Sequence, residues 1–175
     1  KSRLLSEWVP EHTGHTMWWR CRPGLQSVPM LCVAQALQRH EPALRSLGLS
    51  GGVLRELAPL VPALGTGELP APAEDAALLS TLPRVLPRMV DTLVIDDLQW
   101  VDSATLQLLR LLTADLPLRL VAAMRTDDRA ADVRAWLDDE DAAGRVFRLS
   151  LSPWSLPDAH RLIQDLSGHA APKFG

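Results

Sequence analysis

An apolar stretch that stops abruptly at two carboxylates constrains the fold of this chain more than any other part of the sequence. It covers residues 92–97, Thr-Leu-Val-Ile-Asp-Asp, and its β-branched and aliphatic side chains are typical of a buried strand. Comparable stretches at 16–21, 118–125 and 145–151 are also expected to be strands. Because stretches with helical spacing separate them, the sequence predicts an α/β fold in which helices cover a parallel sheet.

The predicted helices carry apolar residues at helical spacing. In the first, at residues 4–9, one face is apolar, and we expect Pro10 to end the helix because proline lacks the N–H that continues it. Asp102 is expected to cap another helix with its side-chain oxygen. Further helices are expected at 28–39, 53–60, from 74 towards the strand at 92, 103–113, 128–139 and 155–166, with a Pro- and Gly-rich surface loop at 62–73.

Composition excludes several classes of protein. The 175 residues are 47% apolar, which is enough for one globular domain with a substantial core. With 18 basic and 21 acidic residues the formal charge is −3, so we expect no direct nucleic-acid binding. Cys21 and Cys32 are too few for a disulfide framework or a structural zinc site, which favours a reducing, cytoplasmic setting. No apolar run approaches the roughly 20 residues that span a bilayer, so no membrane segment is expected.

Polar side chains follow two of the predicted strands at the point where each strand ends. Asp96 and Asp97 end the strand at 92–97, and Arg125 ends the strand at 118–125. Ligands of open parallel sheets bind outside the carboxyl ends of the strands. Because side chains alternate between the faces of a strand, the two aspartates are expected to have different roles. One can hold Mg²⁺ while its neighbour orients a water, and the alternative is a capping Asp beside a solvated loop Asp.

Two segments of the chain resemble a known family. Residues 93–106, Leu-Val-Ile-Asp-Asp-Leu-Gln-Trp-Val-Asp-Ser-Ala-Thr-Leu, and 120–125, Leu-Val-Ala-Ala-Met-Arg, resemble the Walker B and sensor segments of AAA/STAND-type P-loop ATPases. Lys1 and Ser2 look like the last two residues of Walker A, and residues 20–29 are also similar to this family. Such ATPase domains occur in large bacterial transcriptional activators and in cyclase-linked signalling proteins.

The resemblance implies a P-loop NTPase-like three-layer sandwich with a parallel sheet of strand order 5-1-4-3-2. The first strand and most of the phosphate loop are not in this sequence, so we expect the chain to be cut from a longer protein. Residues 1–152 are then expected to be the ATPase core, and residues 153–175 the start of a helical lid region. By the same resemblance the nucleotide is ATP, bound with Mg²⁺.

The family resemblance also implies roles for individual residues. Lys1 compensates phosphate charge, and the Ser2 hydroxyl together with Asp96 holds Mg²⁺. Asp97 polarises the attacking water and Arg125 reads the γ-phosphate. Trp100 follows the acidic strand end and is expected to shape the nucleotide pocket.

The predicted function is that of an ATP-binding switch domain in a bacterial signal-transducing transcriptional regulator. It hydrolyses ATP slowly to ADP and phosphate in the intact parent protein, and the isolated segment is expected to be inactive. Its partners are ATP, neighbouring domains of the parent and, in a nucleotide-dependent oligomer, further copies. The alternative is a nucleotide-sensing or interaction module without turnover.

Two other motifs lead to weaker hypotheses. Residues 48–52, Gly-Leu-Ser-Gly-Gly, match the pattern of a nucleophile elbow, so Ser50 is a candidate serine-hydrolase nucleophile with Asp96 or Asp102 and a later histidine. The residues before Ser50 do not form a strand pattern, which favours a simple turn. His12 and His15 lie three residues apart without a third ligand, so we expect a loop pair rather than a metal site.

Overall fold

The computed structural model describes residues 1–12, 14–65, 75–115, 118–125 and 130–167, and the chain divides into two compact units. Lys1–Arg145 contains the sheet and the helices around it, and Val146–Gly175 contains α8 (Leu156–Ser167). The predicted boundary between core and lid, after residue 152, is a functional division that these units do not address. No described helix is long and apolar enough to cross a membrane.

The sheet of the first unit is parallel, as the sequence predicts. Within the described residues its strands lie in the order β1 (Thr16–Arg20), β2 (Thr92–Asp96) and β3 (Arg119–Ala122). Arg20 lies opposite Asp96, and Ile95 lies opposite Ala122. In a parallel sheet of this register, the carboxyl ends of all three strands meet at one edge.

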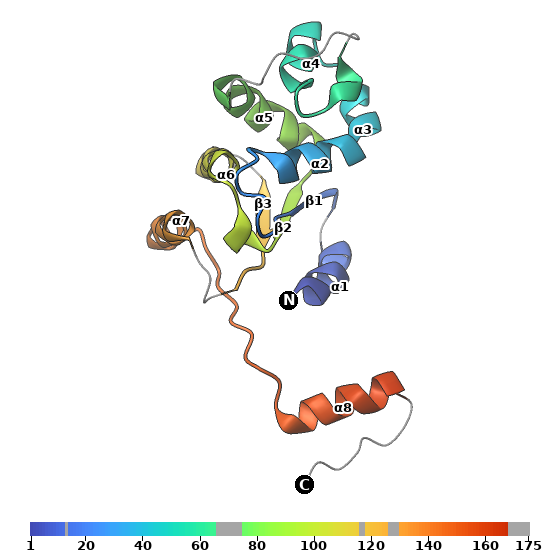
Figure 1. Ribbon diagram of the computed structural model, residues 1–175, viewed down its shortest axis with the longest axis vertical. Coiled ribbons are helices and arrows are strands. Elements are labelled where there is room, and N and C mark those ends of the chain that lie inside the picture. The colour runs from blue at the N-terminus through green and yellow to red at the C-terminus, as the bar shows by residue number, and fades with distance from the viewer. Residues whose placement is uncertain (13, 66–74, 116–117, 126–129, 168–175) are drawn as a thin grey trace. The chain divides into compact units, whose positions relative to one another are not determined.

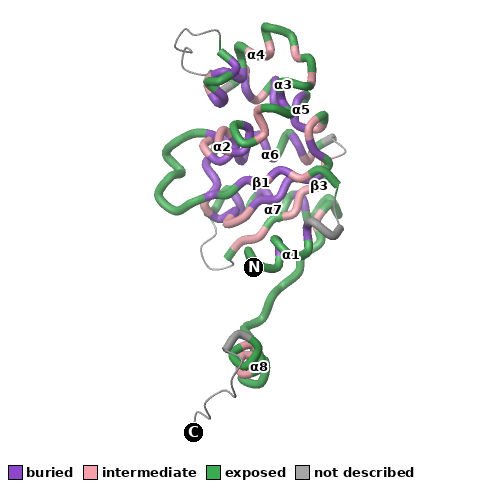
Figure 2. Tube along the Cα trace, turned by 90° about the vertical axis from the view of Figure 1, so that its right-hand side faces the viewer, coloured by how far each residue is buried: buried purple, intermediate pink, exposed green. Residues whose placement is uncertain are grey.

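Helices cover both faces of this sheet (Figure 1). Met17, Trp19 and Ile95 point into the main core, whose other side is formed by α2 (Leu31–Arg39), α5 (Asp75–Met89), α6 (Ser103–Asp115) and α7 (Ala131–Ala142). Trp18 and Val94 point the opposite way and pack against α1 (Ser2–His12). Figure 2 shows buried residues concentrated in the central strands and the helices of the main core. The α/β architecture is therefore confirmed for the described part of the chain.

Several element boundaries differ from the prediction. The first helix continues to His12, so the expected stop at Pro10 is wrong. A proline removes only its own N–H from the helical hydrogen bonds, and the residues after it can still donate to carbonyls four positions earlier in the chain. The second begins at Leu31 rather than 28, because Val28 precedes a proline and Met30 is left-handed, with φ 54°. The remaining elements are α3 (Glu41–Ser46), α4 (Gly51–Leu57), η1 (Pro62–Leu64) and η2 (Leu98–Trp100).

The strand predicted at 145–151 is absent, and this expectation is wrong. The segment has no regular secondary structure, and Phe147 and Leu149 are 91% and 69% exposed. Alternating apolar residues form a strand only when a neighbouring strand accepts their backbone hydrogen bonds, and no described strand pairs with this segment. Residues 66–73 of the predicted loop and the first residues of the predicted helix at 128–139 lie outside the described residues.

Asp102 caps α6, as the sequence predicts, and it has a second structural role. Its Oδ1 accepts the Thr105 N–H at 2.9 Å, and its Oδ2 accepts the Thr105 hydroxyl at 2.6 Å. Oδ1 also accepts the N–H of Met30 at 3.1 Å, so this buried carboxylate joins the start of α6 to the start of α2.

We expect Asp102→Ala to lower the free energy of unfolding by about 2–4 kcal/mol, because it removes a helix cap and leaves the buried Met30 N–H without its acceptor. Urea denaturation measures this loss. Asp139→Ala on α7 is the control, since this carboxylate is exposed and its effect is expected to stay within about 0.5 kcal/mol. Equal midpoints for the two variants would contradict the assignment.

A second prediction concerns Glu140, a buried carboxylate on α7. Arg145 donates to it at 2.8 and 3.1 Å and lowers its pKa, and the Thr113 hydroxyl adds to this shift against the effect of burial. A lowered pKa contributes stability above the ordinary glutamate pKa and loses it as the pH falls through the folded value.

Glu140→Gln is therefore expected to lower stability at neutral pH, and the difference from the wild type should shrink as the pH falls below about 4. Denaturation curves at several pH values check this. Glu7→Gln is the matched control because Glu7 pairs with Arg3 on the exposed side of α1. A difference for Glu140→Gln that does not change with pH would contradict the predicted linkage.

Candidate functional site

The N-terminus of α1 lies against the carboxyl ends of β2 and β3. Ser2 Oγ donates to Asp96 Oδ1 at 3.0 Å, and Lys1 Nζ donates to the Met124 carbonyl at 2.7 Å. These contacts join residues that are 94 and 123 positions apart in the chain. We call this group the strand-end site and include Asp97, Gln99 and Arg125 in it.

Packing of α1 positions Lys1 and Ser2. Leu5 and Val9 lie one helical turn apart and are buried against Val94 of the central strand, with Val121 of β3 at the edge of the same cluster. This apolar contact holds α1 against the face of the sheet on which Val94 lies, so that the first turn of the helix reaches the strand ends. The backbone N–H groups of that turn point in the same direction and favour an anion there.

The two aspartates after β2 have different partners. Asp96 accepts from Ser2, whereas Asp97 Oδ1 accepts from Gln99 Nε2 at 3.0 Å. The backbone of Asp97 lies in the left-handed region, with φ 58° and ψ 45°, a conformation that Asp tolerates better than most residues. This turn ends the strand and directs the second carboxylate away from the first.

Gln99 belongs to the strand-end site although the sequence reasoning did not select it. It is 3% exposed, and its Oε1 accepts the backbone N–H of Arg125 at 3.0 Å. The signal in the sequence was a lone carboxamide between Leu98 and Val101, both of which are buried. A buried polar side chain at such a position must find hydrogen-bond partners.

Arg125 lies three residues beyond the end of β3, next to Met124. Its backbone is held by Gln99, and its side chain is exposed. The structure therefore brings Lys1, Ser2, Asp96, Asp97 and Arg125 to one edge of the sheet. Their chemical roles stay predictions.

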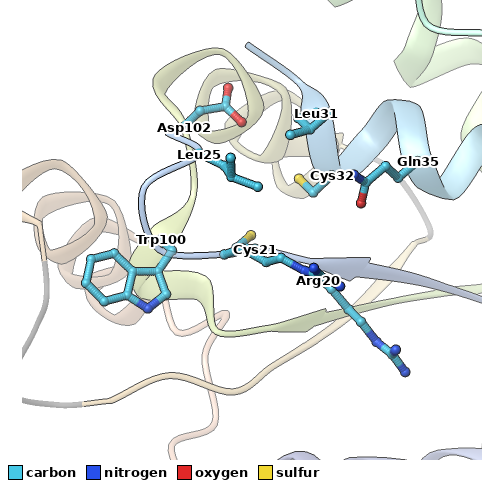
Figure 3. A pocket seen from close by; sticks show the side chains of 9 residues that line it. Arg20, Cys21, Leu25, Leu31, Cys32, Gln35, Trp100 and Asp102 are labelled. Atoms are coloured by element: carbon cyan, nitrogen blue, oxygen red, sulfur yellow. The ribbon is translucent and has the colours of Figure 1, made fainter. Parts of the chain in front are cut away.

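Trp100 lines a different hollow, of about 20 Å³, whose wall includes Cys21, Leu25, Cys32 and Asp102 (Figure 3). None of Lys1, Ser2, Asp96 and Asp97 lines it. A space of this size holds about one water molecule, so it does not admit a nucleotide base in this conformation. The predicted contact of Trp100 with a nucleotide stays a prediction.

The two cysteines beside this hollow are free and buried. Their sulfurs face one another in Figure 3, and Cys32 Sγ lies 3.8 Å from the Thr105 hydroxyl. The hydrogen bond with Cys32, together with burial, raises the pKa of the Cys21 thiol. Cys21 is therefore protonated at neutral pH and acts as a small core residue.

The weaker motifs have structural explanations. Ser50 is exposed and caps α4, where it accepts the Val53 N–H at 3.4 Å, and α3 rather than a strand precedes it. This geometry does not match a nucleophile elbow. His15 lies 3.7 Å from an Asp91 carboxylate oxygen, whereas the side chain of His12 lies outside the described residues. In the described part of the chain, no group of three His, Cys, Asp or Glu residues could hold a metal ion.

Comparisons of the chain with models of protein families, with curated proteins and with solved structures give no match. The functional argument therefore depends on the strand-end site itself. This site offers an ammonium group, a hydroxyl, two carboxylates and a guanidinium at one edge of a parallel sheet. Such a set suits a polyanion that is bound with a hard cation.

The left-handed turn at Asp97 leads to a prediction about stability. Asp97→Ala is expected to lower the free energy of unfolding by about 1–2 kcal/mol, because alanine is disfavoured in this conformation. Asp97→Gly adopts the conformation without that penalty and serves as the control for loss of the carboxylate. Thermal and urea unfolding compare the two variants, and equal stability would contradict the importance of the backbone conformation.

Proposed function

We propose that this chain is the ATP-binding, slowly hydrolysing switch segment of a cytoplasmic bacterial signal-transducing transcriptional regulator, of the AAA/STAND P-loop type. The observation that carries the proposal is the 3.0 Å hydrogen bond between the Ser2 hydroxyl and Asp96 at the carboxyl end of β2. The Walker-like segments at 1–2 and 93–106 are far apart in sequence, and this contact joins them. It is the contact that a shared nucleotide site requires.

Lys1 is suited to binding phosphate. Its ammonium group lies at the N-terminus of α1 and donates to the Met124 carbonyl at 2.7 Å. Phosphate oxygens are stronger acceptors for an ammonium than a neutral carbonyl is. Binding of a triphosphate would therefore exchange this contact for a charged one, with the N–H groups of the first helical turn as additional donors.

Ser2 and Asp96 have the donor atoms that Mg²⁺ prefers. A hydroxyl and one carboxylate are hard oxygen ligands, and protein sites that bind Mg²⁺ with a nucleotide need only one or two of them. Mg²⁺ bound in this way neutralises phosphate charge.

Asp97 is the residue that we assign to positioning the attacking water. One oxygen of its carboxylate is bonded to Gln99, and within the described residues the other has no such partner and can accept a hydrogen bond from a water. Arg125 lies just beyond the end of the neighbouring strand, and its guanidinium can stabilise charge that develops on the γ-phosphate. Hydrolysis then depends on positioning rather than on a covalent intermediate.

Substitutions in the intact protein test this function. Asp97→Asn is expected to lower the rate of ATP hydrolysis by about a hundredfold and to change ATP affinity less than about threefold, because the residue acts on the water. Asp96→Ala should weaken Mg²⁺-dependent ATP binding by about tenfold or more. Calorimetry and a phosphate-release assay measure the two effects.

Asp91→Asn is the matched control, since Asp91 lies before the amino end of β2 and faces His15 rather than the strand-end site. Equal hydrolysis rates for the wild type and Asp97→Asn would overturn the assignment of Asp97. Mg²⁺-dependent ATP binding without turnover in the wild type would favour the alternative, a nucleotide-sensing module. Absence of ATP binding by the intact protein would overturn the proposal.

A further inference from the structure

The hydrogen bonds of the strand-end site form a closed ring of contacts, and Gln99 is the member of this ring to which the proposed hydrolysis assigns no role. Ser2 bonds to Asp96, Asp97 follows it in the chain, and Gln99 bonds to Asp97. Gln99 also bonds to Arg125, whose neighbour Met124 accepts from Lys1. Lys1 and Ser2 are consecutive residues, so the ring of contacts closes at the peptide bond between them.

The chemistry of the two Gln99 contacts requires a carboxamide. A carboxylate such as Asp97 only accepts hydrogen bonds, whereas the backbone N–H of Arg125 only donates one. The side chain between them must therefore present a donor on one side and an acceptor on the other. Glutamine does both, with Nε2 at 3.0 Å from Asp97 Oδ1 and Oε1 at 3.0 Å from the Arg125 nitrogen.

Burial makes the loss of either of these two hydrogen bonds costly. Gln99 is 3% exposed, so water does not replace a lost partner at low cost. The turn that carries Gln99 is also attached to the residue that follows β3, because the Leu98 N–H donates to the Ala123 carbonyl at 3.0 Å. A shift of the loop after β3 would therefore pull on the carboxamide and through it on the Asp97 carboxylate.

We propose that Gln99 is a positioning residue that couples the orientation of the Asp97 carboxylate to the position of Arg125. This inference rests on the proposed function for its catalytic consequence, namely that water orientation by Asp97 responds to the loop that carries Arg125. The coupling itself is a property of the described contacts. It is measured separately from hydrolysis.

The first experiment measures the coupling by NMR in the intact protein without nucleotide. Asp97→Asn is expected to shift the Arg125 backbone amide resonance when Gln99 is present and to leave it nearly unchanged when Gln99 is replaced by Leu. An Arg125 shift of the same size with and without Gln99 would overturn the proposal.

The second experiment measures hydrolysis. Gln99→Leu is expected to lower kcat by roughly ten- to a hundredfold with a change in KM below about threefold, as loss of a hydrogen bond to a catalytic carboxylate predicts. In a chain that already carries Asp97→Asn, the same substitution should lower kcat less than about threefold, because Gln99 acts through Asp97. An equal loss in both backgrounds would mean a merely structural role and overturn the proposal.

Two further variants keep the test valid if Gln99→Leu folds poorly. Gln99→Met keeps the length of the side chain but removes both its donor and its acceptor, so kcat is expected to fall while circular dichroism checks that the fold is kept. Gln107→Leu, an exposed glutamine on α6, is the matched control and should leave kcat and KM unchanged. Wild-type kinetics in Gln99→Met would overturn the proposal. A wild type that shows the NMR coupling but no ATP hydrolysis would support the role of Gln99 and overturn the proposed function.

Discussion

The burial of β2 on both faces and its pairing along both edges is the constraint on which the rest of the structure depends. Residues 92–95 are buried, and β1 and β3 accept and donate the backbone hydrogen bonds on either side. A strand in this position admits no charged side chain until the chain leaves the sheet. Asp96 is the first position where a charge reaches the edge, and for this reason the polar residues of the strand-end site gather there.

The sharp end of this strand also determines the shape of the site. At Asp97 the backbone adopts a left-handed conformation, and η2 follows at once. The turn separates the two carboxylates and brings Gln99 back towards β3, where its carboxamide bonds to the chain beyond that strand. One unfavourable backbone conformation thus allows one carboxylate to face α1 and the other to face the neighbouring loop.

The face of the sheet that α1 covers contributes Lys1 and Ser2 to the site. A small cluster of Leu5, Val9 and Val94 attaches α1 to the sheet, and this contact carries Lys1 and Ser2 to the strand ends. The larger core on the other face stabilises the sheet but supplies none of these groups. The positions of Lys1 and Ser2 therefore depend on the α1 face, whereas most of the buried side chains lie on the other face of the same three strands.

Local sequence patterns were sufficient to predict the three strands of the sheet and the cap of α6. The strands at 16–21, 92–97 and 118–125, the capping role of Asp102 and the α/β class follow from apolar periodicity and side-chain hydrogen bonding within a few residues. The stretch at 145–151 has the same alternating pattern and is not a strand, because a strand also needs a partner that its own sequence does not specify.

The site shows the same limit. Asp96, Asp97 and Arg125 could be selected from their positions after apolar strands, and Lys1 and Ser2 from a family resemblance. Only the tertiary structure decided that Ser2 meets Asp96 and that Gln99, which is close to Asp97 in the chain, also reaches Arg125, since these two contacts join residues 94 and 26 positions apart. A sequence by itself determines which segments are apolar enough to be buried and which side chains can bond, whereas packing determines which of those side chains come within reach of one another.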